Sequence, residues 1–482
     1  MEEHYKIKLH KKANVLRFES YLKELDIDFK KIEYFPNFSI YKIKKTDEKI
    51  IEKILKSEDV KNILPMRRYF LDFKTKKIEN GKINVPVGTR EENSPIIGVI
   101  DNGIEKLPQI KNWLYEDGKK YCAEEQTKTH GTFVAGVILQ YLQNEKVRIY
   151  DGGIVPDFNV VQLEEDELFL RMKKLVEEHS FIKVWNLAIS IRVSVSPDYI
   201  SDFGAFLDFL QDEYNILIVK SAGNGEFEKD IFEKKLILEG ADSARALVVT
   251  SCNKDNKVSS FSLSGIGHKI LTKPDIATYG GDVSFDENNK IKVEGVISFS
   301  PQDDIVSSFG TSFAASKITG MIGKVLAIDN SLSTLFLKAF FVYMAKEPQQ
   351  YILGYGYIGE EIKVEDELKK ISYIEGEVEE FCKLEVEFKN YEFSTVMASE
   401  LEIDYNDKNY IISDLSLELR YKGEKIKNEY GEKDNFNGVK KYKFIFGEKE
   451  GKAELKVVRR KKIENNSEKE KMKFCLIFKN EK

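Results

Sequence analysis

The first 65 residues carry two kinds of hydrophobic pattern. Apolar residues recur three and four positions apart within 15–25 and within 50–55, which predicts two helices with one buried face each. Alternating apolar and polar residues predict four strands, at 5–9, 27–34, 38–43 and 60–64. The order strand, helix, strand, strand, helix, strand is that of a small ferredoxin-like α+β domain. We expect Thr46 to cap the second helix.

The segment 70–94 is polar and loses both patterns. Gly81, Pro86 and Gly88 are expected to break any regular element there. The segment is therefore predicted to be a linker or an exposed strap between two domains.

Short continuous apolar runs replace the alternating pattern after this segment. Such runs are typical of strands buried on both faces of a parallel sheet. They lie at 95–100, 184–190 and 216–220. A helix that is apolar nearly all round begins near His130, and a small-residue helix with apolar residues at helical spacing begins at Ser312. The region 93–375 is therefore predicted to be an α/β domain in which helices flank a mostly parallel sheet.

The last part of the chain, 376–482, returns to alternating apolar and polar positions. This pattern predicts a β-sandwich appended to the central domain. The sequence leaves open whether the sandwich binds substrate, a partner or only the central domain, and stabilising the central domain is the default expectation. The predicted domains are thus 1–92, 93–375 and 376–482.

Composition narrows the class of protein. With 482 residues and 42% hydrophobic content, the chain can form two or three domains with a large core. A net charge of -6 argues against a nucleic-acid-binding protein. The start of the chain has no apolar signal region and no stretch reaches membrane-spanning length, so we expect a cytoplasmic protein without a membrane partner.

Cysteine and histidine usage points away from metal and disulfide chemistry. The four cysteines are far apart, so we expect buried thiols rather than a disulfide framework. The five histidines form no H-E-x-x-H motif, and no metal-binding residues are predicted.

Four polar residues mark the ends of buried strands or the starts of packed helices in the central region. Asp101 follows the first apolar run, and Asn224 lies between two glycines just after the third. His130 and Ser312 stand at the starts of the two apolar helices. Because ligands of open α/β sheets bind at the carboxyl ends of the strands, these side chains are candidates for one site.

Each of these residue types also has an ordinary structural role. Aspartate and asparagine are common in turns, serine is a common helix cap, and a single histidine is more often structural than catalytic. A serine at a helix N-terminus is suited to more than capping, because unpaired backbone N–H groups and the helix dipole beside it favour a developing oxyanion. An asparagine amide can donate a hydrogen bond to the same oxygen.

The order of these residues along the chain is the most specific signal. Aspartate, histidine and serine follow one another as they do in subtilisin, and differently from chymotrypsin and the α/β hydrolases. The surrounding segments read VIDNGI at Asp101, HGTFVAGVI at His130, SAGNG at Asn224 and FGTSFAAS at Ser312. On these motifs, the region from residue 93 to about 375 resembles a subtilase, a subtilisin-like serine peptidase.

The resemblance implies peptide-bond hydrolysis. Ser312 would be the nucleophile, His130 the general base, Asp101 the residue that orients and stabilises the imidazole, and Asn224 the oxyanion donor. It also implies a substrate-binding strand and the loop facing it, at Ala188, Ile189, Ser190 and Gly223. No cofactor is required for this chemistry. Subtilases often carry structural calcium, but the sequence shows no ligand cluster that would fix one.

The sequence departs from the family pattern at three positions. Ser316 replaces the usual proline after the nucleophile and adds an N–H that can change the start of the helix. Asn102 stands where the family prefers serine or threonine, a change expected to have little effect. Ser190 replaces a glycine of the substrate strand, which could narrow the adjoining pocket and alter substrate preference.

An inserted segment precedes the nucleophile. Residues 281–308 have the pattern of a hairpin, with Asn288 and Asn289 as its expected turn. The segment is either a flap that gates access or a surface decoration, and the decoration is slightly favoured.

The N-terminal domain resembles the subtilase propeptide in element order and position. This resemblance implies a zymogen in which residues 1 to about 92 inhibit the peptidase until they are cleaved or displaced. The expected partners are a protein or peptide substrate and, for release, a regulatory protein. Two alternatives stay open: a catalytically impaired binding protein on a subtilase fold, and a partner-released protease effector of a bacterial defence or stress system.

Overall fold

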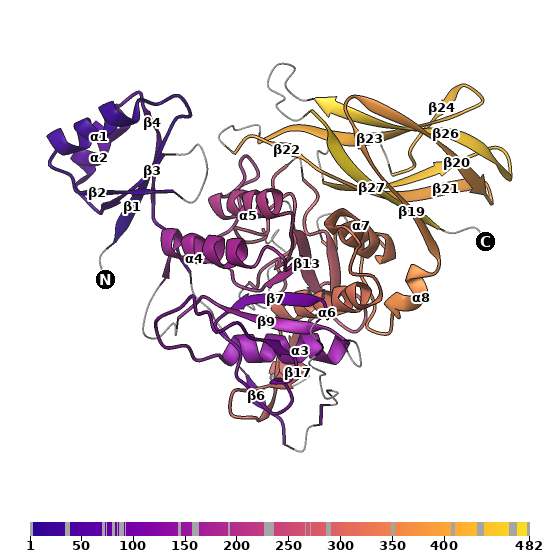
Figure 1. Ribbon diagram of the computed structural model, residues 1–482, viewed down its shortest axis with the longest axis horizontal. Coiled ribbons are helices and arrows are strands. Elements are labelled where there is room, and N and C mark those ends of the chain that lie inside the picture. Colours follow the sequence, from indigo (N-terminus) through magenta and orange to yellow (C-terminus); the bar gives the residue numbers. More distant parts are fainter. Residues whose placement is uncertain are drawn as a thin grey trace.

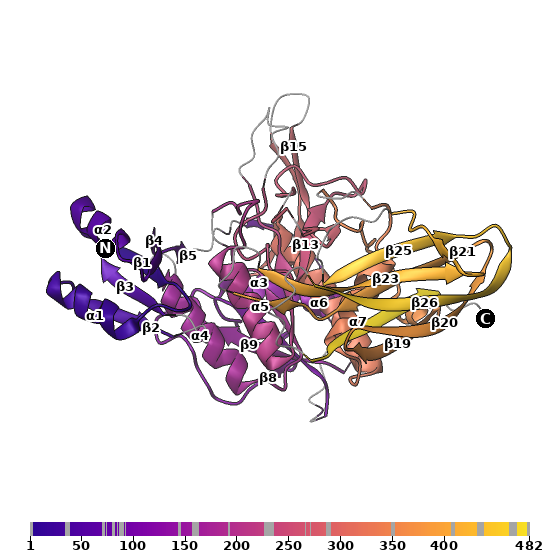
Figure 2. The ribbon, with the colours of Figure 1, turned by 90° about the horizontal axis from the view of Figure 1, so that it is seen from above.

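The protein consists of three bodies arranged along the chain, with the N-terminal body and the C-terminal strands on opposite sides of the central one (Figure 1, Figure 2). Among the residues described, no helix is both long and apolar enough to cross a membrane. The computed structural model describes residues 3–33, 39–69, 73, 75–79, 82–83, 85, 91, 93–142, 146–156, 163–190, 193–225, 236–265, 267–269, 271–285, 291–348, 352–405, 410–430, 438–461 and 470–479.

The N-terminal body has the predicted ferredoxin-like order. Its sheet runs β2-β3-β1-β4 with antiparallel neighbours, and side chains of both helices, such as Phe18 and Ile54, pack on Ile7 and Tyr41 of the sheet. The expected cap at Thr46 is wrong, because the side chain of Asp47 accepts the hydrogen bond from the first turn of α2. The elements are β1 (His4–Leu9), α1 (Val15–Glu24), β2 (Phe29–Ile32), β3 (Ile40–Lys44), α2 (Glu48–Leu55) and β4 (Val60–Pro65).

The central body is built on a seven-stranded sheet in the order β14-β13-β12-β11-β7-β9-β8. Every neighbouring pair in it is parallel, which confirms the predicted fold class. The strands are β7 (Ile96–Asp101), β8 (Leu114–Tyr115), β9 (Arg148–Gly153), β11 (Val184–Leu187), β12 (Leu217–Ser221), β13 (Leu247–Cys252) and β14 (Ile276–Tyr279).

Helices cover both faces of this sheet because alternate strand residues point to opposite sides. Val219 packs with α6 and α7 on one face, whereas Ile218 packs with α4 and α5 on the other. In Figure 1, α4 and α5 lie above β7 and β9, and α3 lies below them. The helices are α3 (Thr129–Leu142), α4 (Glu165–Glu178), α5 (Asp202–Tyr214), α6 (Thr311–Ile328) and α7 (Thr334–Met344).

The inserted segment before α6 forms two antiparallel strand pairs. The pairing of β15 with β16 agrees with the predicted hairpin, whereas its expected turn at Asn288 and Asn289 lies outside the described residues. The second pair, β17 and β18, also takes up a strand from the segment that follows the N-terminal body. The elements are β15 (Asp282–Phe285), β16 (Ile291–Glu294), β17 (Val296–Phe299) and β18 (Ile305–Ser308).

The sequence predicted no regular element in the segment between the N-terminal and central bodies, but the structure contains two short strands, one within this segment and one just before it. Within it, β6 (Lys76–Lys77) pairs antiparallel with β18. Just before it, β5 (Arg68–Tyr69) pairs with β10 (Leu163–Glu164) at the start of α4. Two-residue strands can form despite the glycine and proline residues nearby, because β10 and β18 of the central body supply the hydrogen-bonding partners. The segment is therefore a strap held against the central body.

The C-terminal body confirms the predicted β-sandwich. One layer contains β19, β27, β21 and β25, the other contains β20, β26 and β23, and a single residue pair between β20 and β21 joins them. Side chains from both layers form one apolar core. Its elements are α8 (Val364–Leu368), β19 (Ile371–Val378), β20 (Phe381–Lys389), β21 (Glu392–Ser399), β22 (Glu402–Ile403), β23 (Ile411–Tyr421), β24 (Glu424–Ile426), β25 (Val439–Ile445), β26 (Glu450–Lys461) and β27 (Met472–Lys479).

Candidate active site

Asp101 and His130 form a buried pair at the carboxyl end of the central sheet. Asp101 is the last residue of β7, and its two carboxylate oxygens lie 2.9 and 2.8 Å from Nδ1 of His130 in the first turn of α3. Both side chains are buried. Because a carboxylate only accepts hydrogen bonds, Nδ1 is the donor of this contact, and Nε2 is the ring nitrogen left for another partner.

Asn102 holds the strand and the helix of this pair together. Its backbone N–H donates to Asp101 Oδ1 at 2.8 Å, and its side-chain Oδ1 accepts from the N–H of Gly131 at 2.9 Å. A Cβ at Gly131 would lie 2.3 Å from the carbonyl oxygen of Gly103, so only glycine allows α3 to begin this close to β7. The departure from the family pattern at Asn102 thus ties the predicted acid to the predicted base.

Ser312 lies in the first turn of α6, next to the predicted base. The ring of the following residue, Phe313, has its centroid 6.0 Å from that of His130. The Ser312 hydroxyl donates to the carbonyl oxygen of Ala188 at 3.2 Å rather than to the imidazole. Ser312 is 7% exposed, so a serine at this helix start is buried rather than open to solvent in this arrangement of the chain.

The side chain of Asn224 is fixed by the turn that precedes Ser312. Its Oδ1 accepts from the backbone N–H and from the hydroxyl of Thr311, at 2.9 and 3.0 Å. That hydroxyl in turn accepts from the N–H of Gly223 at 3.1 Å. With its oxygen held in this way, Asn224 has only its Nδ2 donors left to offer, beside Gly310 at the start of α6.

Ser316 does not interrupt the helix that carries the predicted nucleophile. Its hydroxyl donates to the carbonyl oxygen of Ser312 at 2.7 Å, and α6 runs unbroken from Thr311 to Ile328. Serine side chains in helices commonly make this bond to the residue four positions earlier. The loss of the family proline therefore leaves the start of α6 intact.

The predicted substrate-binding residues flank the first turn of α6. Ala188 contacts the Ser312 hydroxyl through its carbonyl, and Ser190, two residues further on, is partly exposed. The side chain of Ile189 is buried in the core shared with α4 and α5, so it does not line the surface beside α6. Gly223 has φ +111 and lies against Leu238, where a Cβ would come within 2.5 Å of that side chain.

An aromatic residue of the strap covers the predicted base. The centroid of the Phe73 ring lies 5.0 Å from that of His130 in an edge-on arrangement, 5.4 Å from that of Phe133 and 6.0 Å from that of Phe313. Sequence reasoning did not single out Phe73. The available signal was the aromatic pair Phe70 and Phe73 at the start of a mostly polar segment.

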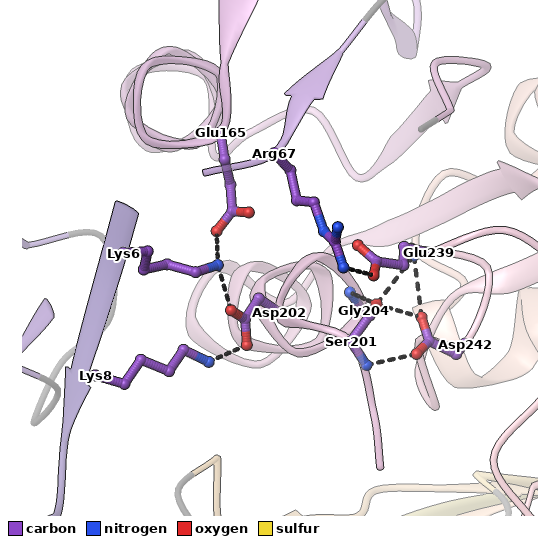
Figure 3. A network of polar contacts seen from close by, with 10 residues as sticks. Lys6, Lys8, Arg67, Glu165, Ser201, Asp202, Gly204, Glu239 and Asp242 are labelled. Atoms are coloured by element: carbon purple, nitrogen blue, oxygen red, sulfur yellow. Dashed lines mark hydrogen bonds and ion pairs between the residues drawn. The ribbon is translucent and has the colours of Figure 1, made fainter. Parts of the chain in front are cut away.

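A buried ion network joins the N-terminal body to the central body. Figure 3 shows Lys6 between Glu165 and Asp202, and Lys8 on Asp202. Beside them, Lys42 lies 2.6 Å from Glu164. The acidic residues stand at the N-termini of α4 and α5, where the helix dipole favours negative charge. Sequence reasoning missed this network, because nothing in the pattern pairs these residues.

The network sets the ionisation of its central carboxylate. Burial alone would raise the pKa of Asp202, but Lys6 and Lys8 outweigh burial and hold that pKa below its usual value of 3.8. Next to the network, Arg67 lies 3.4 Å from Glu239, whose pKa burial raises to about 7. Asp202 is therefore a charged anchor for the N-terminal body at neutral pH.

Metal ligands do not gather in the described parts of the chain. Within these parts, no group of three or more histidine, cysteine, aspartate or glutamate side chains is placed to hold a metal ion.

Comparison with known proteins decides the family. A family model described as the subtilase family matches residues 92–357, more than half of the chain. The chain belongs to the subtilase family. Its matched region contains Asp101, His130, Asn224 and Ser312, and its fold is that of a subtilisin-like serine protease. A comparison with curated protein sequences finds no match.

Solved structures of other subtilases share the fold at low sequence identity. A mutant of the epidermin leader peptide processing serine protease from Staphylococcus aureus superposes with a TM-score of 0.52 and 16% identity, covering 74% of this chain and 98% of that one. Fervidolysin from Fervidobacterium pennivorans, a keratinolytic enzyme, gives a TM-score of 0.50 and 14% identity, covering 92% of this chain and 69% of that one. These likenesses concern the fold alone.

Proposed function

We propose that this subtilase is a serine endopeptidase that uses Asp101, His130 and Ser312, and that its N-terminal body keeps it latent. The observation that carries the proposal is the buried pair of Asp101 and His130 beside the first turn of α6. This pair leaves Nε2 of His130 as a base next to a serine at a helix N-terminus, the combination that activates a hydroxyl for attack on a peptide carbonyl.

The reaction would proceed in two halves. Rotation of the Ser312 side chain away from the carbonyl of Ala188 brings its hydroxyl to His130, which accepts the proton as Oγ bonds to the scissile carbonyl carbon. Asp101 holds the imidazole in the required tautomer and stabilises its positive charge. His130 then donates the proton to the leaving amine, and a water molecule, activated by the same base, releases the acyl group from Ser312.

The oxyanion that forms in each half would be stabilised at the start of α6. The Nδ2 donors of Asn224 and the backbone N–H of Ser312 are the proposed hydrogen-bond donors. The contacts of Thr311 with Asn224 hold the amide in position before the reaction, which avoids the cost of reorganising it. The positive end of the α6 dipole adds to this stabilisation.

Latency is supported by the way the N-terminal body and the strap lie on the central body. Phe73 covers the imidazole of His130, and β6 is hydrogen-bonded to β18 just ahead of α6. Lys6 and Lys8 contact Asp202 at the start of α5 and so fix where the N-terminal body docks on the central body. We propose that residues 1–92 must be cleaved or displaced, by the protease itself or by a regulatory protein, before a substrate reaches Ser312.

The alternative of an impaired, substrate-binding subtilase rested on Ser316. The hydrogen bond from Ser316 to the carbonyl of Ser312 and the continuous helix α6 give that alternative no support. Release by a partner of a defence or stress system stays a hypothesis about the trigger.

Digestion of an unfolded protein tests the proposal. The purified chain and its Ser312→Ala variant are incubated with a denatured protein, and new termini are mapped by mass spectrometry, both in the substrate and in the chain itself. The proposal predicts internal cleavage of the substrate, and self-cleavage within 70–94, by the wild type alone. Identical cleavage by Ser312→Ala would contradict it.

A further inference from the structure

Lys220 is a fully buried lysine next to the predicted substrate-binding residues. It lies in β12, and its ammonium group donates to the carbonyl oxygen of Ser221 at 2.8 Å, to the hydroxyl of Ser221 at 3.1 Å and to the hydroxyl of Ser190 at 3.2 Å. Lysine is almost never fully buried unless an anion is paired with it. All three of these acceptors are neutral.

No carboxylate of the described residues forms an ion pair with Lys220. Asp242 affects the pKa of Lys220 through its charge, without a hydrogen bond to it. The oxygens of Asp242 accept instead from the N–H and hydroxyl of Ser201, at 2.6 and 2.7 Å, and from the N–H of Gly240 at 3.0 Å. Burial consequently lowers the pKa of Lys220 to about 7, against the weaker opposing effect of Asp242. An anion bound beside Lys220 would supply the missing partner.

The hydroxyls of Ser190 and Ser221 have the chemistry to donate to such an anion. Each accepts a hydrogen bond from Lys220, so its own proton is free to be donated elsewhere. In the part of the chain that the structure describes, neither proton has another acceptor. The two hydroxyls, polarised by one ammonium group, can act as a pair of hydrogen-bond donors. A carboxylate side chain has two acceptor oxygens and can therefore accept from both hydroxyls.

The position of this group relates it to one residue of the substrate. Ser190 comes two residues after Ala188, which contacts the Ser312 hydroxyl, and Ser221 comes three residues before Asn224. The substrate residue whose carbonyl is attacked must place its carbon at Ser312 and its oxygen at Asn224. Its side chain is therefore expected between these two segments, where Ser190 is partly exposed and Ser221 is buried.

We propose that Lys220, with Ser190 and Ser221, selects substrates that carry glutamate or aspartate at the residue contributing the scissile carbonyl. This inference rests on the proposed serine-peptidase function and names its substrate class. The carboxylate accepts hydrogen bonds from the two hydroxyls and completes the charge pair with Lys220. An amide or apolar side chain at this position leaves the buried ammonium without its anion.

Peptidyl aryl phosphonates, which bond covalently to an active serine, test this inference on the full chain. Three otherwise identical probes carry Glu, Gln or Leu next to the phosphorus. The wild type should react about tenfold faster with the Glu probe than with the Gln probe, the effect of one charge-assisted hydrogen bond. Since a docked N-terminal body slows all three probes alike, the ratio of rates is the measured quantity.

Two variants assign the preference to this group. Lys220→Met, which keeps the length of the side chain, should bring the Glu to Gln ratio close to one, whereas Ser190→Ala, which removes a donor and spares the lysine, should lower it part of the way. A simple fluorophosphonate, which lacks a side chain to select, shows in parallel that Ser312 is reactive in each protein.

The outcomes separate the inference from the function on which it rests. If the fluorophosphonate labels Ser312 while the wild type reacts equally with Glu and Gln, or while Lys220→Met keeps the full preference, the assignment of Lys220 is overturned and the peptidase function stands. If the fluorophosphonate labels neither the wild type nor the Phe73→Ala variant, in which the site is uncovered, the proposed peptidase function is overturned.

Discussion

The ring of Phe73 stands edge-on against the imidazole of His130, with the two centroids 5.0 Å apart. Phe73 belongs to the strap that follows the N-terminal body, and His130 is the predicted base of the central body. The contact therefore places a piece of the N-terminal region on the residue that the proposed chemistry needs. It links the folding of the strap to access to the active site.

Replacing Phe73 by alanine is expected to uncover the site. The variant loses three aromatic contacts of the strap, with His130, Phe133 and Phe313, each of which contributes about 0.5–1.5 kcal/mol beyond its buried area. The rate at which a fluorophosphonate labels Phe73→Ala should exceed that of the wild type. Leu16→Ala is the control, since Leu16 is 77% exposed on the N-terminal body, away from the strap, and it should leave the rate unchanged. Equal rates for Phe73→Ala and wild type would mean that the strap does not limit access.

Acid is expected to loosen the N-terminal body before the central body unfolds. Lys6 and Lys8 hold the pKa of Asp202 below 3.8 against the opposite effect of burial, and undocking returns it towards that value. Below pH 3.8, Asp202 binds more protons in the undocked state than in the docked state. Its contribution to docking is therefore complete above this pH and is lost as the pH falls through the lower pKa of the docked state.

Hydrogen exchange of the Ser312→Ala chain measures this effect. Protection of β1, corrected for the pH dependence of chemical exchange, should fall below about pH 4 while that of β12 persists. In Asp202→Asn, which removes the titrating carboxylate, β1 should be less protected at neutral pH and should lose less on acidification. A loss of protection in β1 and β12 at the same pH would show global unfolding instead.

Asp101→Asn should abolish most of the activity without disturbing the fold. An amide at this position no longer forces the proton onto Nδ1 of His130, so the imidazole can present the wrong nitrogen to Ser312. Turnover of a peptide substrate should drop about 10⁴-fold, with a thermal unfolding midpoint close to that of the wild type. Activity within a few-fold of the wild type would remove Asp101 from the catalytic set.

Asn224→Ala should act on turnover rather than on substrate binding. Losing one oxyanion donor costs about 10²- to 10³-fold in kcat, and KM should change little because the bond strengthens in the transition state. Thr311→Ser is the control, since it keeps the hydroxyl that holds Asn224 and should stay close to the wild type. A rise in KM at constant kcat would indicate a substrate-binding role for Asn224 instead.

The parts of this structure that sequence could predict are those with strong local patterns. The apolar run at 95–100 forecasts a buried parallel strand, and such a strand fixes where its last side chain, Asp101, must lie. Glycine and serine at the start of an apolar helix similarly forecast the position of Ser312. These are local rules, which is why the fold class and the positions of these residues at the strand and helix ends follow from them.

The remaining features depend on contacts between distant segments. Phe73 contacts His130 because the strap lies across the central body. The hydrophobic pattern of the strap does not predict where it will lie. The pairing of Lys6 with Asp202 joins two domains, and the bond from Lys220 to Ser190 depends on how the segment after β11 lies beside β12. Tertiary packing alone brings such pairs together.

The central claim, that Ser312 is a nucleophile activated by His130, is tested most directly by covalent labelling. The purified chain, its Phe73→Ala form, and the Ser312→Ala and His130→Ala variants of that form are treated with a fluorophosphonate, and the modified residue is located by mass spectrometry. The account predicts a single adduct on Ser312, formed faster in Phe73→Ala and absent from Ser312→Ala and His130→Ala. No adduct on Ser312 in Phe73→Ala, or an equal one in the absence of His130, would contradict it.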